Sequence, residues 1–207
     1  MLHHERRQKA PENYARQMAL AESCATPSLL CLAVMLAAAV FSLGSPLGAG
    51  GQQKAKFELR SVAFAQGANI PRQFTCDDAD ISPALSWNEP PQGTQSFALI
   101  MDDPDAPAGT FVHWVVYNLP ADSRQLPERI PGNDALTGGT LQGVNDFPRT
   151  GYGGPCPPPG RPHRYFFKLY ALDAKLNLKA GARKQDVERA MKGHILAQAE
   201  LMGRYGR

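Results

Sequence analysis

The chain has 207 residues, of which 43% are hydrophobic, so it is long enough for one domain with a sizeable buried core. Its formal net charge is only +3, and no run of lysine and arginine is interleaved with aromatic residues. This composition argues against nucleic acid as a main partner, because phosphate backbones are bound by a concentrated basic face.

An uncharged apolar segment occupies residues 29–43. Basic residues precede it, namely Arg6, Arg7, Lys9 and Arg16. A basic region followed by an apolar stretch of this length is typical of a secretory signal peptide. We therefore divide the chain into residues 1–50, the basic region and signal peptide, and residues 51–207, the folded domain. The prediction is an exported protein, periplasmic or secreted; the alternative is a membrane anchor through residues 29–43, which is shorter than the roughly 20 apolar residues that span a bilayer.

Removal of a signal peptide would also remove Cys24 and Cys31, leaving Cys76 and Cys156 in the mature domain. A single cysteine pair in an oxidising compartment favours a disulfide. We predict a bond between Cys76 and Cys156. Two separately buried thiols are the alternative that the sequence leaves open, because bonding needs Cα atoms within about 7 Å.

From about residue 55 onward, segments rich in aromatic and β-branched residues predict strands, each bounded by Gly, Pro, Asp or Asn. These segments are residues 57–64, 96–101, 111–118 and 164–172. Residues 111–118 are almost continuously apolar, which predicts a strand buried on both faces. Turn-rich segments separate the strands, at residues 88–93, 102–109, 131–140 and 151–162.

Helical periodicity appears only near the C-terminus. Apolar residues recur there at spacings of three to four, at Val187, Met191, Ile195, Ala199 and Met202. This pattern predicts a helix that ends at Gly203. Predominant strands, turns between them and one terminal helix predict a mainly β fold, a β-sandwich with peripheral helices.

The first candidate functional element is the turn Asp-Asp-Pro-Asp-Ala-Pro at residues 102–107, directly after an apolar strand. Its prolines fix φ and stiffen the turn, and a locally extended backbone would place Asp103 and Asp105 on one face. For an isolated motif of this kind, an Asx-type turn that merely bonds nearby amides is the more frequent explanation.

Two further junctions carry titratable groups. His113 lies within an apolar strand, where a lone histidine is more often a satisfied core residue than a functional one. A loop rich in Gly and Pro at residues 151–160 leads into His163 and Tyr165, which share a strand face while Arg164 lies on the other. Glycines in this loop would let amide N–H groups approach an anion closely.

Convergence of these three junctions would build a concave site. Acidic groups beside two imidazoles should raise the imidazole pKa values and favour cationic histidine. Such a site would hold a phosphate or carboxylate through histidine and glycine N–H donors. Its aspartates would orient the imidazoles or meet an amine on the same ligand.

At these residues the sequence resembles the phosphatidylethanolamine-binding protein family, which includes the Raf kinase inhibitor proteins, and especially its bacterial and archaeal branch. The resemblance rests on DPDAP at residues 103–107, VHWVVYNLP at 112–120 and GYGGPCPPPGRPHRY at 151–165. Softer similarity includes FTCDDADISPALSW at 74–87 and the terminal GHILAQAELMGRYGR.

The resemblance implies a β-sandwich of two antiparallel sheets with a small, rigid anion pocket near one end. Residues that match the family's pocket are Asp103, Asp105, His113, His163 and Tyr165, and those that match its Gly-Pro loop are Gly153, Gly154 and Pro155. It implies non-enzymatic binding of phosphate, carboxylate or a phospholipid head group, with no cofactor. The oligomeric state stays open between a monomer and a homodimer.

Two other functions compete with this prediction. One is a secreted interaction module or inhibitor-like regulator whose pocket captures an anionic group on a protease- or kinase-like partner. The other is a metal-binding hydrolase, in which His113, His163 and Asp103 would form a two-histidine, one-carboxylate site. Carboxylates two residues apart on one turn are poorly placed for a glycosidase, and the sequence lacks the Gly-x-Ser-x-Gly motif of serine hydrolases.

Overall fold

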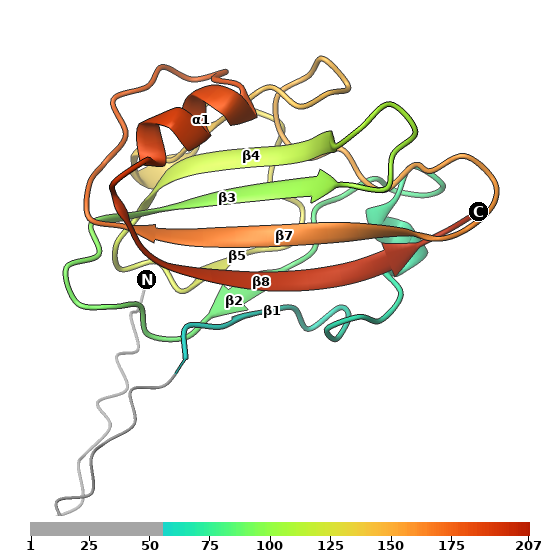
Figure 1. Ribbon diagram of the computed structural model, residues 1–207, viewed down its shortest axis with the longest axis horizontal. Helices are drawn as coiled ribbons and strands as arrows, with labels where there is room; N and C mark the ends of the chain where they lie inside the picture. The colour runs from blue at the N-terminus through green and yellow to red at the C-terminus, as the bar shows by residue number, and fades with distance from the viewer. Residues whose placement is uncertain (1–55) are drawn as a thin grey trace, which may run out of the picture. The chain divides into compact units, whose positions relative to one another are not determined.

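The computed structural model describes residues 56–207, so the predicted signal peptide lies outside the described residues. Most of this part of the chain is strand and loop (Figure 1). The strands are β1 Leu59–Arg60, β2 Leu85–Trp87, β3 Ser96–Asp103, β4 Phe111–Pro120, β5 Gln125–Leu126, β6 Leu141–Gln142, β7 His163–Leu172 and β8 Ile195–Tyr205. The helical elements are the 3-10 turns η1 Arg72–Phe74 and η2 Thr137–Gly139 and the α-helix α1 Lys184–Met191. No helix within residues 56–207 is long and apolar enough to cross a bilayer.

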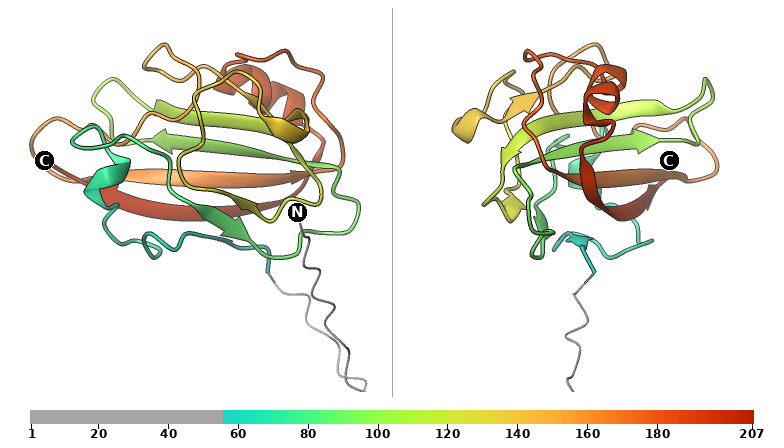
Figure 2. Two further views of the ribbon diagram at one scale, coloured as in Figure 1. Left: turned by 180° about the vertical axis from the view of Figure 1, so that it is seen from behind. Right: turned by 60° about the vertical axis from the view of Figure 1, so that its left-hand side comes forward.

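The strands form two antiparallel sheets, as predicted. The larger has the order β6-β4-β3-β7-β8 and the smaller the order β1-β2-β5. Figure 2 shows the small sheet on one side of the large one and α1 near its other side. The fold is therefore the predicted β-sandwich with peripheral helices.

Strand β3 shows why the large sheet is buried on both faces. Side chains of a strand alternate between its faces. Phe97, Leu99 and Met101 pack into the core between the two sheets, while Ala98 and Ile100 pack into a second core beneath α1. All eight residues of β3 are buried, and β4 is almost as deeply buried, in agreement with its continuous apolar sequence.

The predicted C-terminal helix is wrong in extent. Only Lys184–Met191 is helical, and the chain then turns at Gly193, where φ is +85°. From Ile195 it becomes β8, which pairs with β7 from Leu172 to His163. Alternate residues such as Ala199, Leu201 and Gly203 face the core, so the local sequence also has period two. Pairing with β7 selects the strand, because it satisfies the backbone groups of an edge that would otherwise stay open.

Candidate functional site

The predicted site residues meet at one end of the large sheet. Strand β3 ends at Asp103 and β7 begins at His163, and the two strands are antiparallel, so these termini lie at the same end. Asp103 continues the row of β3 residues that faces the small sheet, and His163 and Tyr165 begin the matching row on β7. Arg164, between them, is exposed, as the period of two predicted.

A β-bulge brings His113 into this group. Met101 pairs with Trp114 and Asp102 pairs with Val112, so His113 is the extra residue on β4. A bulge of this kind redirects a side chain. The imidazole of His113 lies edge-on to the Tyr165 ring, with the ring centroids 5.2 Å apart, and is 3% exposed.

Asp103 organises the centre of the cluster. Its Oδ2 accepts a hydrogen bond of 2.7 Å from Nδ1 of His163, and its Oδ1 accepts one of 2.8 Å from the backbone N–H of Asp105. The second bond is an Asx-type turn, the more frequent explanation for an isolated motif of this kind. The same carboxylate therefore stiffens the turn and orients one imidazole.

His113 is held by the Gly-Pro loop. Its Nδ1 lies 2.6 Å from the carbonyl oxygen of Gly153. A carbonyl can only accept, so Nδ1 carries the hydrogen and Nε2 is the nitrogen that can gain or lose a proton. Burial lowers the pKa of His113, and this effect outweighs the opposing hydrogen bond to Gly153 and the charge of Asp103. The expectation that neighbouring acids raise the pKa of both imidazoles is therefore wrong for His113.

Tyr165 contributes a buried hydroxyl with no partner. The residue is fully buried, and its hydroxyl is one of two buried side-chain polar atoms in residues 56–207 without a hydrogen bond, the other being Nε1 of Trp87. Burial raises the pKa of Tyr165, and the nearby Asp103 raises it further through its charge and an interaction of its side chain with the hydroxyl, although the geometry of a full hydrogen bond is not reached. The hydroxyl therefore stays protonated as a donor. A buried donor left unpaired costs about 1–3 kcal/mol, which marks this atom as a position where a ligand would be stabilising.

Asp105 is bonded to Arg164 and to neither imidazole of the cluster. Its carboxylate accepts hydrogen bonds from the side chain of Arg164 at 2.8 and 2.9 Å and from the Arg164 backbone at 3.0 Å. These interactions, led by the side-chain hydrogen bond, lower the pKa of Asp105 to about 2. The expectation that Asp103 and Asp105 act side by side on the imidazoles is therefore incorrect, because the second carboxylate is bonded to Arg164 and not to an imidazole.

The Gly-Pro loop also differs from its expected role. The N–H of Gly153 donates to the carbonyl of His113, and that of Gly154 donates to Oδ1 of Asp80. Neither amide is open to an anion, so the predicted backbone nest is not present at these positions. Close packing explains the glycines, because a Cβ would collide with Phe147 at Gly153 and with the carbonyl of Phe74 at Gly154.

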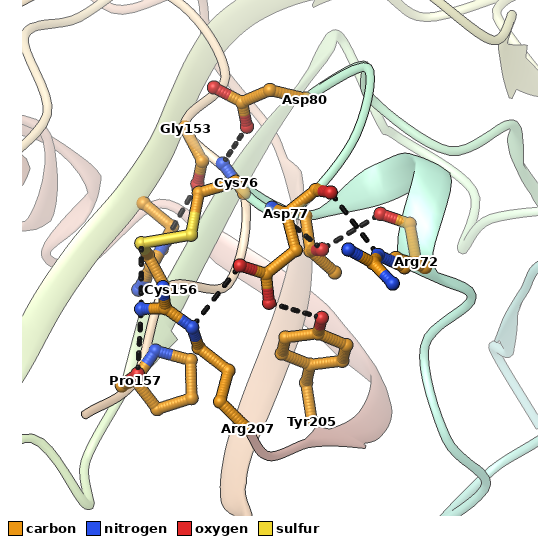
Figure 3. The surroundings of a disulfide bond; sticks show 12 residues. Arg72, Cys76, Asp77, Asp80, Gly153, Cys156, Pro157, Tyr205 and Arg207 are labelled. Atoms are coloured by element: carbon orange, nitrogen blue, oxygen red, sulfur yellow. Dashed lines mark hydrogen bonds and ion pairs between the residues drawn. A yellow bond between two sulfur atoms is a disulfide. The ribbon is translucent and has the colours of Figure 1, made fainter. Parts of the chain in front are cut away.

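Pro155 and the disulfide fasten this loop to the segment after η1. The carbonyl of Pro155 accepts a hydrogen bond of 3.1 Å from the N–H of Cys76. Cys76 and Cys156 are joined by a disulfide, with their Cα atoms 5.4 Å apart (Figure 3). The two segments are 80 residues apart in sequence and meet only through the tertiary fold.

A family model described as phosphatidylethanolamine-binding protein matches residues 60–206, most of the chain. The chain belongs to this family. Two relatives named UPF0098 protein are similar over most of the chain. One from Aquifex aeolicus is 53% identical, covering 77% of this chain and 92% of the relative. One from Methanothermobacter thermautotrophicus is 51% identical, covering 72% and 98%.

Solved structures of this family show the same fold. The PEBP homologue CT736 from Chlamydia trachomatis is 39% identical, with a TM-score of 0.68, covering 73% of this chain and 98% of that one. E. coli YbcL, described as a member of the mammalian PEBP family, is 34% identical, with a TM-score of 0.69, covering 74% and 99%.

The alternative metal site requires His113, His163 and Asp103 to converge as ligands. Within residues 56–207, no three side chains of His, Cys, Asp or Glu come together as metal ligands. Asp103 and the Gly153 carbonyl engage Nδ1 of His163 and His113, which leaves only Nε2 of each ring to coordinate a metal.

Several residues that contact the site were not predicted from the sequence. Phe111 and Phe147 enclose the His113 ring, with centroids 5.1 and 5.5 Å from it. Asp80 holds the Gly154 amide and pairs with Arg149 at 2.6 Å. Only the acidic segment around Asp80 gave a local signal, since the aromatic contacts depend on how distant loops fold together.

Proposed function

We propose that the chain is a non-enzymatic binding protein that holds a small phosphate- or carboxylate-bearing group at the cluster of Asp103, His113, His163 and Tyr165. The observation that carries this proposal is the buried, unpartnered hydroxyl of Tyr165. An anion accepting from this hydroxyl would remove the cost of leaving the donor unpaired.

The two imidazoles each have one ring nitrogen left for a ligand. The Nδ1 atoms of His113 and His163 are both taken by protein acceptors. When an anion binds, Nε2 of His113 gains a proton and donates to it, and the positive charge offsets the ligand's negative charge. Asp103 keeps the His163 ring in place while this happens.

A phosphorylethanolamine-like head group fits the chemistry of the cluster. Its phosphate would accept from imidazole and phenol donors, and its ammonium group would be attracted by the carboxylate of Asp103. The family's name refers to a phospholipid with this head group. Against a two-carboxylate hydrolase, Asp103 and Asp105 belong to one turn and are bonded to His163 and Arg164, so they do not face each other across a substrate.

Removal of a single oxygen tests the proposal. Tyr165→Phe is expected to weaken binding of acetate and phosphorylethanolamine about tenfold, because one hydrogen bond to a charged group is lost. The same change should leave the melting temperature unchanged or raise it, since a buried unsatisfied hydroxyl disappears. Titration calorimetry and thermal unfolding measure the two effects.

His113→Ala removes a whole imidazole donor and is expected to abolish binding of acetate and phosphorylethanolamine. His194→Ala is the matched control, because His194 is an exposed histidine that also bonds an aspartate, Asp173, at 2.8 Å. Unchanged affinities in both Tyr165→Phe and His113→Ala would refute the assignment of the cluster as the binding site.

Binding should depend on pH in a defined direction. Because burial lowers the pKa of His113, the free protein at neutral pH holds this imidazole neutral, and an anion must take up a proton to bind. Acetate affinity is therefore expected to fall as pH rises from 6 to 8, by up to about tenfold per pH unit. Calorimetry in two buffers of different ionisation enthalpy should show uptake of a proton. His113→Gln should bind weakly with little pH dependence, whereas an unaltered pH profile in this variant would assign the proton elsewhere.

A further inference from the structure

The disulfide lies on the surface beside the loop that supports the cluster. Cys76 and Cys156 are both exposed, although their neighbours Thr75 and Pro157 are buried. Exposed disulfides are the ones open to attack by external thiolates and are generally more easily reduced than buried ones. The exposure of both residues favours access of a reductant to the bond in the folded domain.

Arg207 gives the two sulfur atoms different surroundings (Figure 3). Its Nη1 lies 3.8 Å from Sγ of Cys156 and donates to the carbonyl of Pro157 at 3.2 Å. Its Nε pairs with the carboxylate of Asp77, the residue that follows Cys76, at 3.1 Å. A guanidinium beside a sulfur stabilises its thiolate, so charge is better accommodated on Cys156 than on Cys76, which adjoins a carboxylate.

The bond also lies close to contacts that reach the cluster. Cys156 is three residues beyond Gly153, whose carbonyl holds His113. Besides the disulfide, hydrogen bonds join the loop to η1 and the segment after it, from the Cys76 amide to Pro155, from Gly154 to Asp80 and from the Tyr152 hydroxyl to the Phe74 carbonyl. Arg207 adds a bridge between Pro157 and Asp77. Opening the disulfide would leave this junction dependent on those hydrogen bonds and on packing.

We propose that the Cys76–Cys156 bond is a thiol–disulfide exchange site that clamps the candidate anion site. The thiolate of a dithiol reductant attacks Sγ of Cys76, the Cys76–Cys156 bond breaks, and Cys156 leaves as a thiolate stabilised by Arg207. The second thiol of the reductant then attacks the mixed disulfide and releases Cys76. The reductant becomes a disulfide, and two electrons and two protons pass to the cysteines.

The effect on anion binding rests on the proposed function, whereas the exchange chemistry does not. Reduction is expected to weaken acetate binding roughly tenfold, which corresponds to the loop keeping its present arrangement in roughly one molecule in ten. Re-oxidation should restore the affinity.

Exchange is tested first, without any anion. The oxidised protein is treated with excess glutathione under native conditions, quenched by alkylation and mapped by mass spectrometry. The expected product carries glutathione on Cys76 and the alkyl group on Cys156. Adducts distributed equally, found mainly on Cys156, or formed only in denaturant would overturn the proposal.

The role of Arg207 has its own variants. Arg207→Gln should slow reduction by dithiothreitol about threefold and reduce the preference for Cys76, while Arg207→Lys should retain most of both. Arg204→Gln, three residues earlier on β8 and with an exposed side chain, is the matched control and should behave as wild type. Equal reduction rates in Arg207→Gln and Arg204→Gln would remove Arg207 from the mechanism.

Anion binding is then compared by calorimetry in the oxidised and reduced protein, at a pH where the oxidised form binds acetate. Equal affinities would overturn the clamp. Cys76→Ser/Cys156→Ser should bind acetate with the affinity of the reduced wild type, and its affinity should not change when reductant is added. Absence of acetate binding to the oxidised protein would instead refute the proposed function and leave the result of the exchange experiment standing.

Discussion

The double variant Cys76→Ser/Cys156→Ser is expected to unfold with a free energy about 4 kcal/mol lower than that of the oxidised wild type. The bond closes a loop of 80 residues, and chain-entropy arguments assign about 4.5 kcal/mol to a loop of this length. Both side chains are exposed, so the serines bury no new hydroxyl. Urea unfolding followed by fluorescence measures the difference in midpoint and slope.

The comparison under reducing conditions is the control for this variant. Reduced wild type and the double variant should then unfold at nearly the same urea concentration, because neither contains the cross-link. If the oxidised wild type and the variant already share a midpoint, the disulfide contributes no net stability to the domain.

Asp102→Ala is expected to lower the free energy of unfolding by about 3 kcal/mol. The carboxylate is only 1% exposed and accepts from Nζ of Lys168 at 2.8 Å and from Nζ of Lys184 at 2.6 Å. Removing it leaves two ammonium groups without their shared partner under α1. The lysine side chains are 25% and 19% exposed and can reach water in part, so the effect falls at the lower end for a broken buried pair.

An apolar replacement of the whole group provides the matched control. In Asp102→Leu combined with Lys168→Met and Lys184→Met, no charge remains buried, and much of the lost stability should return. Urea unfolding of both variants measures this. If Asp102→Ala lowers the free energy of unfolding by no more than about 0.5 kcal/mol, Asp102, Lys168 and Lys184 contribute no more than an exposed salt bridge does.

The strands could be predicted from the sequence because apolar side chains occupy the strand faces that are buried. Residues 96–101, 111–118 and 164–172 correspond to β3, β4 and β7, and the unbroken apolar run in β4 matches burial on both sides. The first predicted strand is reduced to Leu59–Arg60, since the rest of residues 57–64 pairs with no neighbouring strand. Apolar spacing near the C-terminus fitted a helix and a strand equally, and the partner β7 decided between them.

In the candidate site, too, the sequence identified the residues and the tertiary structure decided their contacts. The motifs identified Asp103, His113, His163 and Tyr165, and the period of two correctly separated Arg164 from its neighbours. A local sequence pattern could not predict which of these side chains contact one another or how their pKa values shift. Whether an imidazole gains or loses a proton depends on how much water its surroundings exclude, and for His113 burial outweighs the nearby charge.

By itself, the sequence determined the class of fold, the family and the residue types that gather at one end of the large sheet, because these depend on local periodicity and on motifs. Only the tertiary structure decided that a bulge redirects His113 and that Asp105 is bonded to Arg164. It also decided that the amides of the Gly-Pro loop donate to protein acceptors. It also placed Arg207 beside one sulfur of the disulfide. Each of these contacts joins residues from separate strands or loops, and their distances are set by the packing of the two sheets.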